Sequence, residues 1–119
     1  MRNAVITGAS SGIGKALAIE LATRGWNLAL GARRMERLEQ VARAAREAGG
    51  SAVAIRLDVT DTASIDAFWR QAEASLGEID ALISNAGRSA LAPLVECSDE
   101  DLKADVVVNL LSHLWVAKR

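Results

Sequence analysis

Apolar residues along the chain form short continuous runs that alternate with longer stretches of helical spacing. The short runs predict buried strands at residues 3–7, 26–31, 52–57 and 79–83. The stretches between them predict helices at 13–24, 35–48 and 63–76, each with apolar positions on one face. After a loop that contains Pro93, a last helix is predicted from about Asp99 toward Lys118, with Ser98 as its N-cap.

This order of elements predicts an α/β fold. Strands that alternate with helices of ten or more residues pair in parallel, because a parallel partner needs a long crossover connection. The strands are nearly continuous apolar runs, which is typical of a sheet covered by helices on both faces. We therefore expect a doubly wound parallel sheet with the strand order 3-2-1-4.

Composition narrows the functional classes. The chain has 119 residues, of which 50% are hydrophobic, and 14 Lys and Arg residues balance 15 Asp and Glu residues. Such a mixed surface does not favour binding to nucleic acid or to an anionic membrane. A single cysteine, Cys97, and a single histidine, His113, are too few for an intrachain disulfide or a structural zinc site. The first predicted strand begins at Asn3 with no export signal before it, so a cytoplasmic protein is expected.

A glycine-rich loop, T-G-A-S-S-G-I-G-K at residues 7–15, joins the first strand to the first helix. We expect Gly8 to allow the sharp turn, Gly12 to let a ligand approach the backbone, and Gly14 to let the helix pack closely on the sheet. The helix then begins with free amides that suit a pyrophosphate, and Ser10 and Ser11 add hydroxyl donors. The alternative is a loop that only turns the chain.

The stretch T-G-A-S-S-G-I-G resembles the cofactor fingerprint of the short-chain dehydrogenase/reductase family. Three further matches follow in order along the chain. Asp58-Val59 resembles the family's adenine-binding acidic position, Asn85-Ala86-Gly87 resembles its Asn-Asn-Ala-Gly turn, and Asn109 resembles its catalytic asparagine. Ser84 departs from the pattern, because the family usually has the first asparagine of that turn there.

The resemblance implies a Rossmann-type fold in which residues 1–119 are the N-terminal portion of a single dinucleotide-binding domain. It assigns the pyrophosphate to Gly8, Ser10, Ser11, Gly12, Ile13 and Gly14, the adenine to Asp58 and Val59, and the ribose and nicotinamide side to Asn85, Ala86 and Gly87. From the residues alone, Asp58 also suits a helix N-terminal acid or an Asx turn.

The end of the second predicted strand bears on the choice between NAD and NADP. A carboxylate there would favour NAD, but the sequence has Gly31-Ala32-Arg33-Arg34. Arginine meets a 2′-phosphate with a planar pair of donors, so NADP(H) is favoured over NAD(H). The alternative is that Arg33 and Arg34 are solvated charges that pair with Glu36 or Glu39.

Hydride transfer to a carbonyl also needs a proton donor or acceptor. In the family that group is a tyrosine, assisted by a lysine four residues later and by a serine, and this sequence contains no tyrosine. Only Asn109 can be assigned to the family's catalytic set, and its amide could instead satisfy backbone groups near the fourth strand. His113 lies one helical turn beyond Asn109, but we expect a packed or surface role for it, and a buried apolar role for Cys97.

The resemblance therefore implies the cofactor-binding half of an oxidoreductase that acts, when complete, on a small carbonyl or a secondary alcohol. The resemblance implies a homo-oligomer for the complete protein. The alternatives are a non-catalytic dinucleotide-binding module and an inactive fragment. An unpaired fourth strand and an uncovered helix face would make the isolated chain marginally stable, with a urea midpoint below that of an ordinary complete domain.

Overall fold

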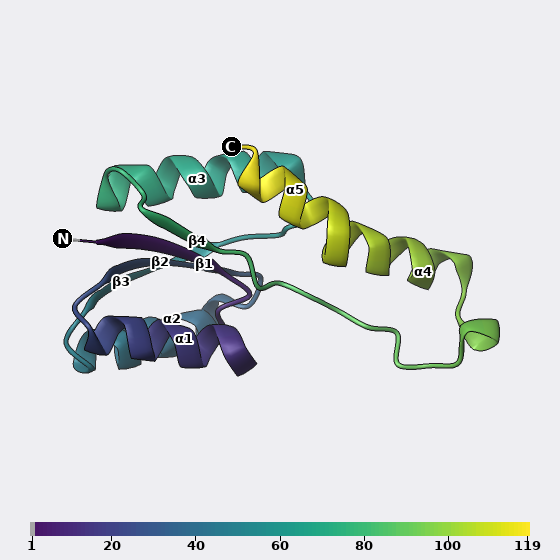
Figure 1. Cartoon of the computed structure of the whole chain (residues 1–119), viewed down its shortest axis with the longest axis horizontal. Coiled ribbons are helices and arrows are strands. Elements are labelled where there is room, and N and C mark those ends of the chain that lie inside the picture. The colour runs from purple at the N-terminus through teal and green to yellow at the C-terminus, as the bar shows by residue number, and fades with distance from the viewer. Residues whose placement is uncertain (1) are drawn as a thin grey trace.

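The computed structural model describes residues 2–119 and contains the predicted alternation of strands and helices (Figure 1). The strands are β1 (Asn3–Thr7), β2 (Asn27–Ala32), β3 (Ser51–Arg56) and β4 (Ala81–Ile83). The helices are α1 (Gly12–Thr23), α2 (Met35–Glu47), α3 (Thr62–Leu76), α4 (Asp99–Val106) and α5 (Ser112–Ala117), with a 3-10 turn at Leu94–Glu96 and a π-helical segment at Val107–Leu111.

The four strands form one parallel sheet in the order β3-β2-β1-β4, which confirms the predicted topology. Strand β1 lies at the centre of the sheet, where Val5 pairs with Ala29 of β2 on one side and with Leu82 of β4 on the other. Because neighbours beside β1 are reached through crossovers on opposite sides, the chain leaves a crevice above the carboxyl ends of β1 and β4.

Helices cover both faces of the sheet, α1 and α2 on one and α3 and α5 on the other (Figure 1). Successive side chains of a strand point to opposite faces, so β1 supplies Ile6 to the core under α1 and α2 and Val5 to the core under α3 and α5. Phe68 of α3 is fully buried at the centre of the second core. This two-sided burial explains why the strands are continuous apolar runs.

Most element boundaries lie within one residue of the sequence prediction, and two elements differ from it more substantially. Strand β4 begins at Ala81 rather than at Ile79. The residue before it, Asp80, is hydrogen-bonded to Asn3 by its backbone amide, which donates to the Asn3 carbonyl at 2.9 Å. The Asp80 carboxylate also accepts from the Asn3 amide at 2.8 Å, so a side chain takes the place of a ladder partner there. The last helix is not one regular helix, since a π-helical segment separates α4 from α5. Its start is as predicted, with the Ser98 hydroxyl accepting from the Asp101 amide at 3.0 Å.

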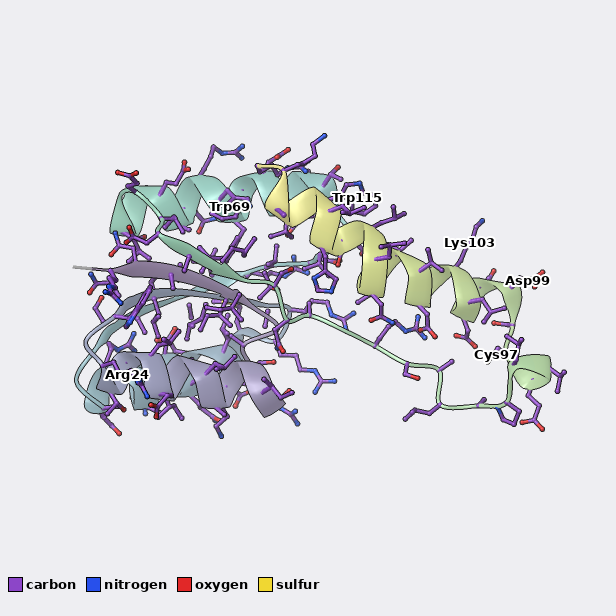
Figure 2. All side chains as sticks on the ribbon, in the orientation of Figure 1. Arg24, Trp69, Cys97, Asp99, Lys103 and Trp115 are labelled. Carbon is purple, nitrogen blue, oxygen red and sulfur yellow. The ribbon has the colours of Figure 1, made fainter. Side chains whose placement is uncertain are left out.

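The segment after β4 runs away from the sheet and returns as α4, which gives the molecule its long axis of 48 Å (Figure 1). Cys97 lies in this projecting part, far from the sheet (Figure 2). The expectation of a buried apolar role for Cys97 is wrong. Its side chain is only half-buried, and the thiol contacts the carbonyl oxygens of Pro93 and Ala92 at 3.5 and 3.6 Å.

The three tryptophans pack against the cores, and all three keep some exposure. Trp69 and Trp115 lie where α3 and α5 meet (Figure 2), and the Trp69 indole donates to the Val116 carbonyl at 3.1 Å. This bond attaches the last helix to α3. Between residues 2 and 119, no helix is long and apolar enough to cross a membrane.

Candidate functional site

A cleft of about 450 Å³ opens along the carboxyl ends of the strands. Each of the four strands is followed by a segment that lines it, so residues far apart in the sequence meet there. Ten residues assigned from the sequence line this cleft: Gly8, Ser10, Ser11, Arg33, Arg34, Asp58, Val59, Asn85, Ala86 and Gly87. Gly12, Ile13, Gly14 and Asn109 lie outside its lining.

The glycine loop is held tightly against the segment that follows β4. Gly8 has a φ of +63°, and a Cβ atom there would lie 2.9 Å from the Ala86 Cα atom. A Cβ atom at Gly14 would lie 2.4 Å from the Gly8 carbonyl oxygen and 2.7 Å from the Asn85 side-chain Nδ2 atom. Glycine is therefore required at both positions by close packing of the backbone.

The amino end of α1 faces the cleft with its amides available. Ser11 is the N-cap, and its side chain makes no capping hydrogen bond within residues 2–119. Gly12 has a φ of +56°, and a Cβ atom there would meet nothing within 4 Å in the described part of the chain. Ile13 is 71% exposed. Because the first amides of a helix have no partner inside it, this end of α1 suits an anionic group.

Three arginines gather where β2 ends. Arg33 and Arg34 line the cleft as the sequence suggested, and Arg37 of α2 joins them. The alternative pairing with Glu39 is not seen among the described residues, and the Glu39 carboxylate instead accepts from Arg46 at 2.9 Å. The ion pairs found among residues 2–119 include neither Glu36 nor any of the three cleft arginines. This part of the cleft is therefore positively charged and exposed to solvent.

Asp58 follows β3 and forms an Asx turn with Thr60. Its Oδ1 atom accepts from the Thr60 hydroxyl at 2.7 Å and from the Thr60 amide at 3.0 Å. The hydroxyl bond is the largest cause that holds the pKa of Asp58 below its ordinary value, with smaller contributions from the amide bond and from the charges of Arg33 and Arg56. Partial burial opposes this shift. Because both bonds use Oδ1, Oδ2 remains to accept a hydrogen bond from a ligand.

The segment after β4 is fixed by a buried hydroxyl. Thr7 is 1% exposed, and its Oγ1 atom accepts from the Asn85 and Ala86 amides at 2.9 and 3.2 Å. The Asn85 side chain donates to the Gly8 carbonyl at 3.2 Å. These bonds join the glycine loop to the opposite wall of the cleft, so the two walls keep one relative position.

Asn109 lies in the π-helical segment beside this wall. Its Oδ1 atom accepts from the Arg88 amide at 2.8 Å, and its Nδ2 atom donates to the Arg88 carbonyl at 2.6 Å. Both ends of the Asn109 amide therefore bind the backbone of Arg88, the residue after Gly87. This fits the alternative role for Asn109, in which its amide satisfies backbone groups near the fourth strand. The His113 Nδ1 atom lies 2.5 Å from the Ser84 hydroxyl, and the His113 side chain is half-buried, in line with the expected packed role.

Sequence reasoning missed several residues that line the cleft: Arg37, Leu57, Thr60, Arg88, Ala104 and Val108. Arg37 could have been found, since it lies in the first turn of α2, three residues after Arg34 at the N-cap of that helix. Ala104 and Val108 carried no signal, because their position depends on the path of α4 past the sheet. The Arg88 guanidinium is directed toward that helix, where it pairs with Asp101 at 3.4 Å and with Asp105 at 3.1 Å.

Comparison with known proteins identifies the family. The family described as short chain dehydrogenase matches residues 2–119. A fatty acyl-CoA reductase of Acinetobacter baylyi is 44% identical over 93% of this chain and 42% of its own length, so the chain spans less than half of that relative. An alcohol dehydrogenase from the archaeon Thermococcus sibiricus, solved in complex with 5-hydroxy-NADP, superposes with a TM-score of 0.94 at 39% identity, covering 99% of this chain and 51% of that one. A NAD+-bound xylitol dehydrogenase gives a TM-score of 0.93 at 30% identity, covering 98% of this chain and 45% of that one. The chain belongs to the short-chain dehydrogenase family.

Proposed function

We propose that this chain binds NADP(H) in the cleft and is the cofactor-binding half of an oxidoreductase. The complete enzyme would transfer hydride between NADP(H) and a small carbonyl or a secondary alcohol. The observation that carries the proposal is the meeting, in one cleft, of a helix amino end, an arginine cluster and the Asp58 carboxylate. These three features suit, in order, a diphosphate, a further phosphate and an adenine amino group.

The assignments follow the walls of the cleft. Gly8, Ser10, Ser11, Gly12, Ile13 and Gly14 would hold the diphosphate, Asp58 and Val59 the adenine, and Asn85, Ala86 and Gly87 the ribose and the nicotinamide side. Gly12, Ile13 and Gly14 would contribute backbone amides rather than side chains, because the first amides of a helix have no partner inside it. When bound, the nicotinamide would supply the hydride chemistry.

The preference for NADP(H) over NAD(H) rests on charge. A phosphate on the adenosine ribose carries close to two negative charges, and Arg33, Arg34 and Arg37 supply three positive ones at the end of β2. None of the three is held by a carboxylate within residues 2–119, so all can turn toward a ligand. The solved relatives named above carry an NADP derivative in one case and NAD+ in the other, so the family likeness alone does not set this preference.

Calorimetric titration with NADPH and NADH tests the cofactor assignment. Replacing Arg33→Ala and Arg34→Ala together should weaken NADPH binding about tenfold or more, because charge-assisted hydrogen bonds are lost, and should change NADH binding by less than about twofold. Arg43→Ala is the control for a loss of positive charge outside the cleft, since it removes one of the two charges from the exposed side of α2. Equal losses for both nucleotides would reject the phosphate assignment, and no binding by the unaltered chain would reject the function.

We further propose that this chain by itself binds the cofactor without turnover. It contains no tyrosine, the residue that supplies the proton in the family it belongs to. Asn109, the remaining member of the catalytic set, has both ends of its amide bound to Arg88. We expect saturable NADPH binding but no NADPH oxidation with a panel of small aldehydes and ketones. Steady oxidation that disappears in Asn109→Ala would contradict this.

The exposed face of the last helix supports a proposal of self-association. Val106, Leu110 and Leu114 follow one another at a spacing of four residues and are 52%, 55% and 57% exposed. Such a stripe is apolar surface that a second copy of the chain could bury, and closed homo-oligomers are the commonest assemblies. Sedimentation should show a dimer or larger species that Leu110→Asp dissociates. A monomer at high concentration would contradict the proposal.

A cytoplasmic location completes the proposed function. It is supported by the free, half-buried Cys97, whose thiol is the only one in the sequence. Fractionation of cells that produce the untagged protein should place it with soluble cytoplasmic markers. Recovery with the membrane or the secreted fraction would contradict this location.

A further inference from the structure

The segment Ser84–Arg88, which forms one wall of the cleft, is bound to the last helix at both of its ends. Ser84 at its start lies 2.5 Å, hydroxyl to Nδ1, from His113. Arg88 at its end exchanges two backbone hydrogen bonds with the Asn109 side chain, at 2.8 and 2.6 Å. The two wall residues are four apart in sequence and so are their two partners, which lie one helical turn from each other.

These side-chain contacts lie beyond the part of β4 that the sheet itself fixes. The parallel ladder between β1 and β4 ends with the pair Ile6 and Ile83. From Ser84 onward the backbone is held by side chains instead, by Thr7 on the inner side and by the helix on the outer side. A wall without ladder bonds depends on such contacts for its position.

We propose that His113 is a positioning residue, which acts through Ser84 to hold Asn85, Ala86 and Gly87 at the place that the dinucleotide requires. Asn109 fixes the other end of the same wall. The Ser84 hydroxyl donates when the His113 Nδ1 atom is unprotonated and accepts when that atom carries the proton, so the contact exists in either tautomer. Asn109 lies in a π-helical segment, a distortion that is frequent at functional sites.

This inference rests on the proposed cofactor site, but its first test does not. Amide hydrogen exchange reads the wall directly, because the Asn85, Ala86 and Arg88 amides all donate to side chains. Ser84→Ala and His113→Leu should each speed exchange at these amides about twofold to tenfold, the loss expected from one hydrogen bond. Exchange in β2 and β3 should not change. His113→Asn, which keeps an acceptor near the place of Nδ1, should restore most of the protection.

Cofactor affinity gives the second test. Ser84→Ala and His113→Leu should each weaken NADPH binding about twofold to tenfold. The double variant should lose no more NADPH affinity than the single variant with the larger loss, since both substitutions remove the same interaction. Lys118→Ala, an exposed change at the end of the same helix, is the matched control and should leave exchange and affinity unchanged.

The outcomes separate the inference from the proposed function. Faster wall exchange in a chain that does not bind NADPH would support the positioning role of His113 and reject the cofactor site. Unchanged wall exchange in both single variants, or additive losses of NADPH affinity in the double variant, would overturn the positioning role. Failure of His113→Asn to restore protection would also overturn it, because the role assigned to His113 is that of a hydrogen-bond partner.

Discussion

Replacing Gly14 by alanine tests the central geometry of the site, the close approach of α1 to the glycine loop. The added methyl group would lie 2.4 Å from the Gly8 carbonyl oxygen, 2.7 Å from the side-chain Nδ2 atom of Asn85 and 3.0 Å from the Gly8 carbonyl carbon. Two of these three atoms belong to the backbone and cannot rotate away. We therefore expect α1 to move outward from the sheet and the hydrogen bond between Asn85 and Gly8 to weaken.

The expected change in the free energy of unfolding combines one stabilising and two destabilising contributions. Alanine is favoured over glycine inside a helix by about 1 kcal/mol, which stabilises the variant. Overpacking a close contact costs about 1 to 3 kcal/mol, and loss of the hydrogen bond between Asn85 and Gly8 costs about 1 kcal/mol more. The free energy of unfolding of Gly14→Ala should therefore fall by about 1 to 3 kcal/mol, despite the better helix propensity. NADPH affinity should fall as well, because the same shift displaces the amides of the first turn.

Urea denaturation and calorimetric titration measure the two effects separately, and Gly25→Ala is the control. Gly25 has a φ of +81°, and a Cβ atom there would meet nothing within 4 Å in the described residues. Alanine at that position should cost about 1 to 2 kcal/mol of stability through backbone strain alone. NADPH affinity should be unchanged, since Gly25 lies at the opposite end of α1. A Gly14→Ala variant with the stability and affinity of the parent chain would refute the close-packing argument.

Two further predictions concern the fold and its dependence on pH. Because its folded-state pKa is lowered, Asp58 stabilises the fold above its ordinary pKa of 3.8, and this stabilisation is lost as the pH falls through the lower folded value. Thr60→Val, which removes the main cause of the shift, should reduce this loss in unfolding curves measured between about pH 2 and pH 6; an unchanged pH dependence would contradict the assignment. Phe68→Ala should cost about 3 to 5 kcal/mol, measured by urea denaturation, because the ring is fully buried between α3 and the sheet. A loss below about 1 kcal/mol would show that the second core is loosely packed.

The sheet could be predicted from the sequence because its signals are local. Ala4, Val5 and Ile6 are apolar in succession because both faces of β1 are covered, and that pattern is visible without any knowledge of the partners. The strand order then follows from the handedness and length of the helical crossovers. The start of β4 could not be predicted, because the pairing of Asp80 with Asn3 joins residues 77 positions apart.

The residues that line the cleft at the strand ends could be predicted for the same reason. Glycines, arginines and carboxylates at strand ends occupy places that the topology of a parallel sheet fixes. The wall next to the last helix could not be predicted. Arg88 is placed by Asn109 and by Asp105, and Ala104 and Val108 reach the cleft only because α4 passes beside it. No periodicity in residues 99–118 indicates the π-helical segment, which changes the face that each later residue presents.

The walls of the cleft differ in how much they depend on the last helix. The walls formed by strand ends are held by the sheet and by Thr7, so they should persist whenever the core is folded. The wall from Ser84 to Arg88 depends in addition on α5, whose attachment to the rest of the chain includes the bond between Trp69 and Val116. Disturbing that attachment should loosen the wall from Ser84 to Arg88 before the walls that follow β2 and β3. Nucleotide fragments can separate the two effects. If the cofactor lies as proposed, an adenosine bisphosphate reaches only the walls that follow β2 and β3, so it should keep its affinity in Trp69→Phe while intact NADPH binds more weakly. Equal losses for both ligands would show that the two sides of the cleft form one cooperative unit.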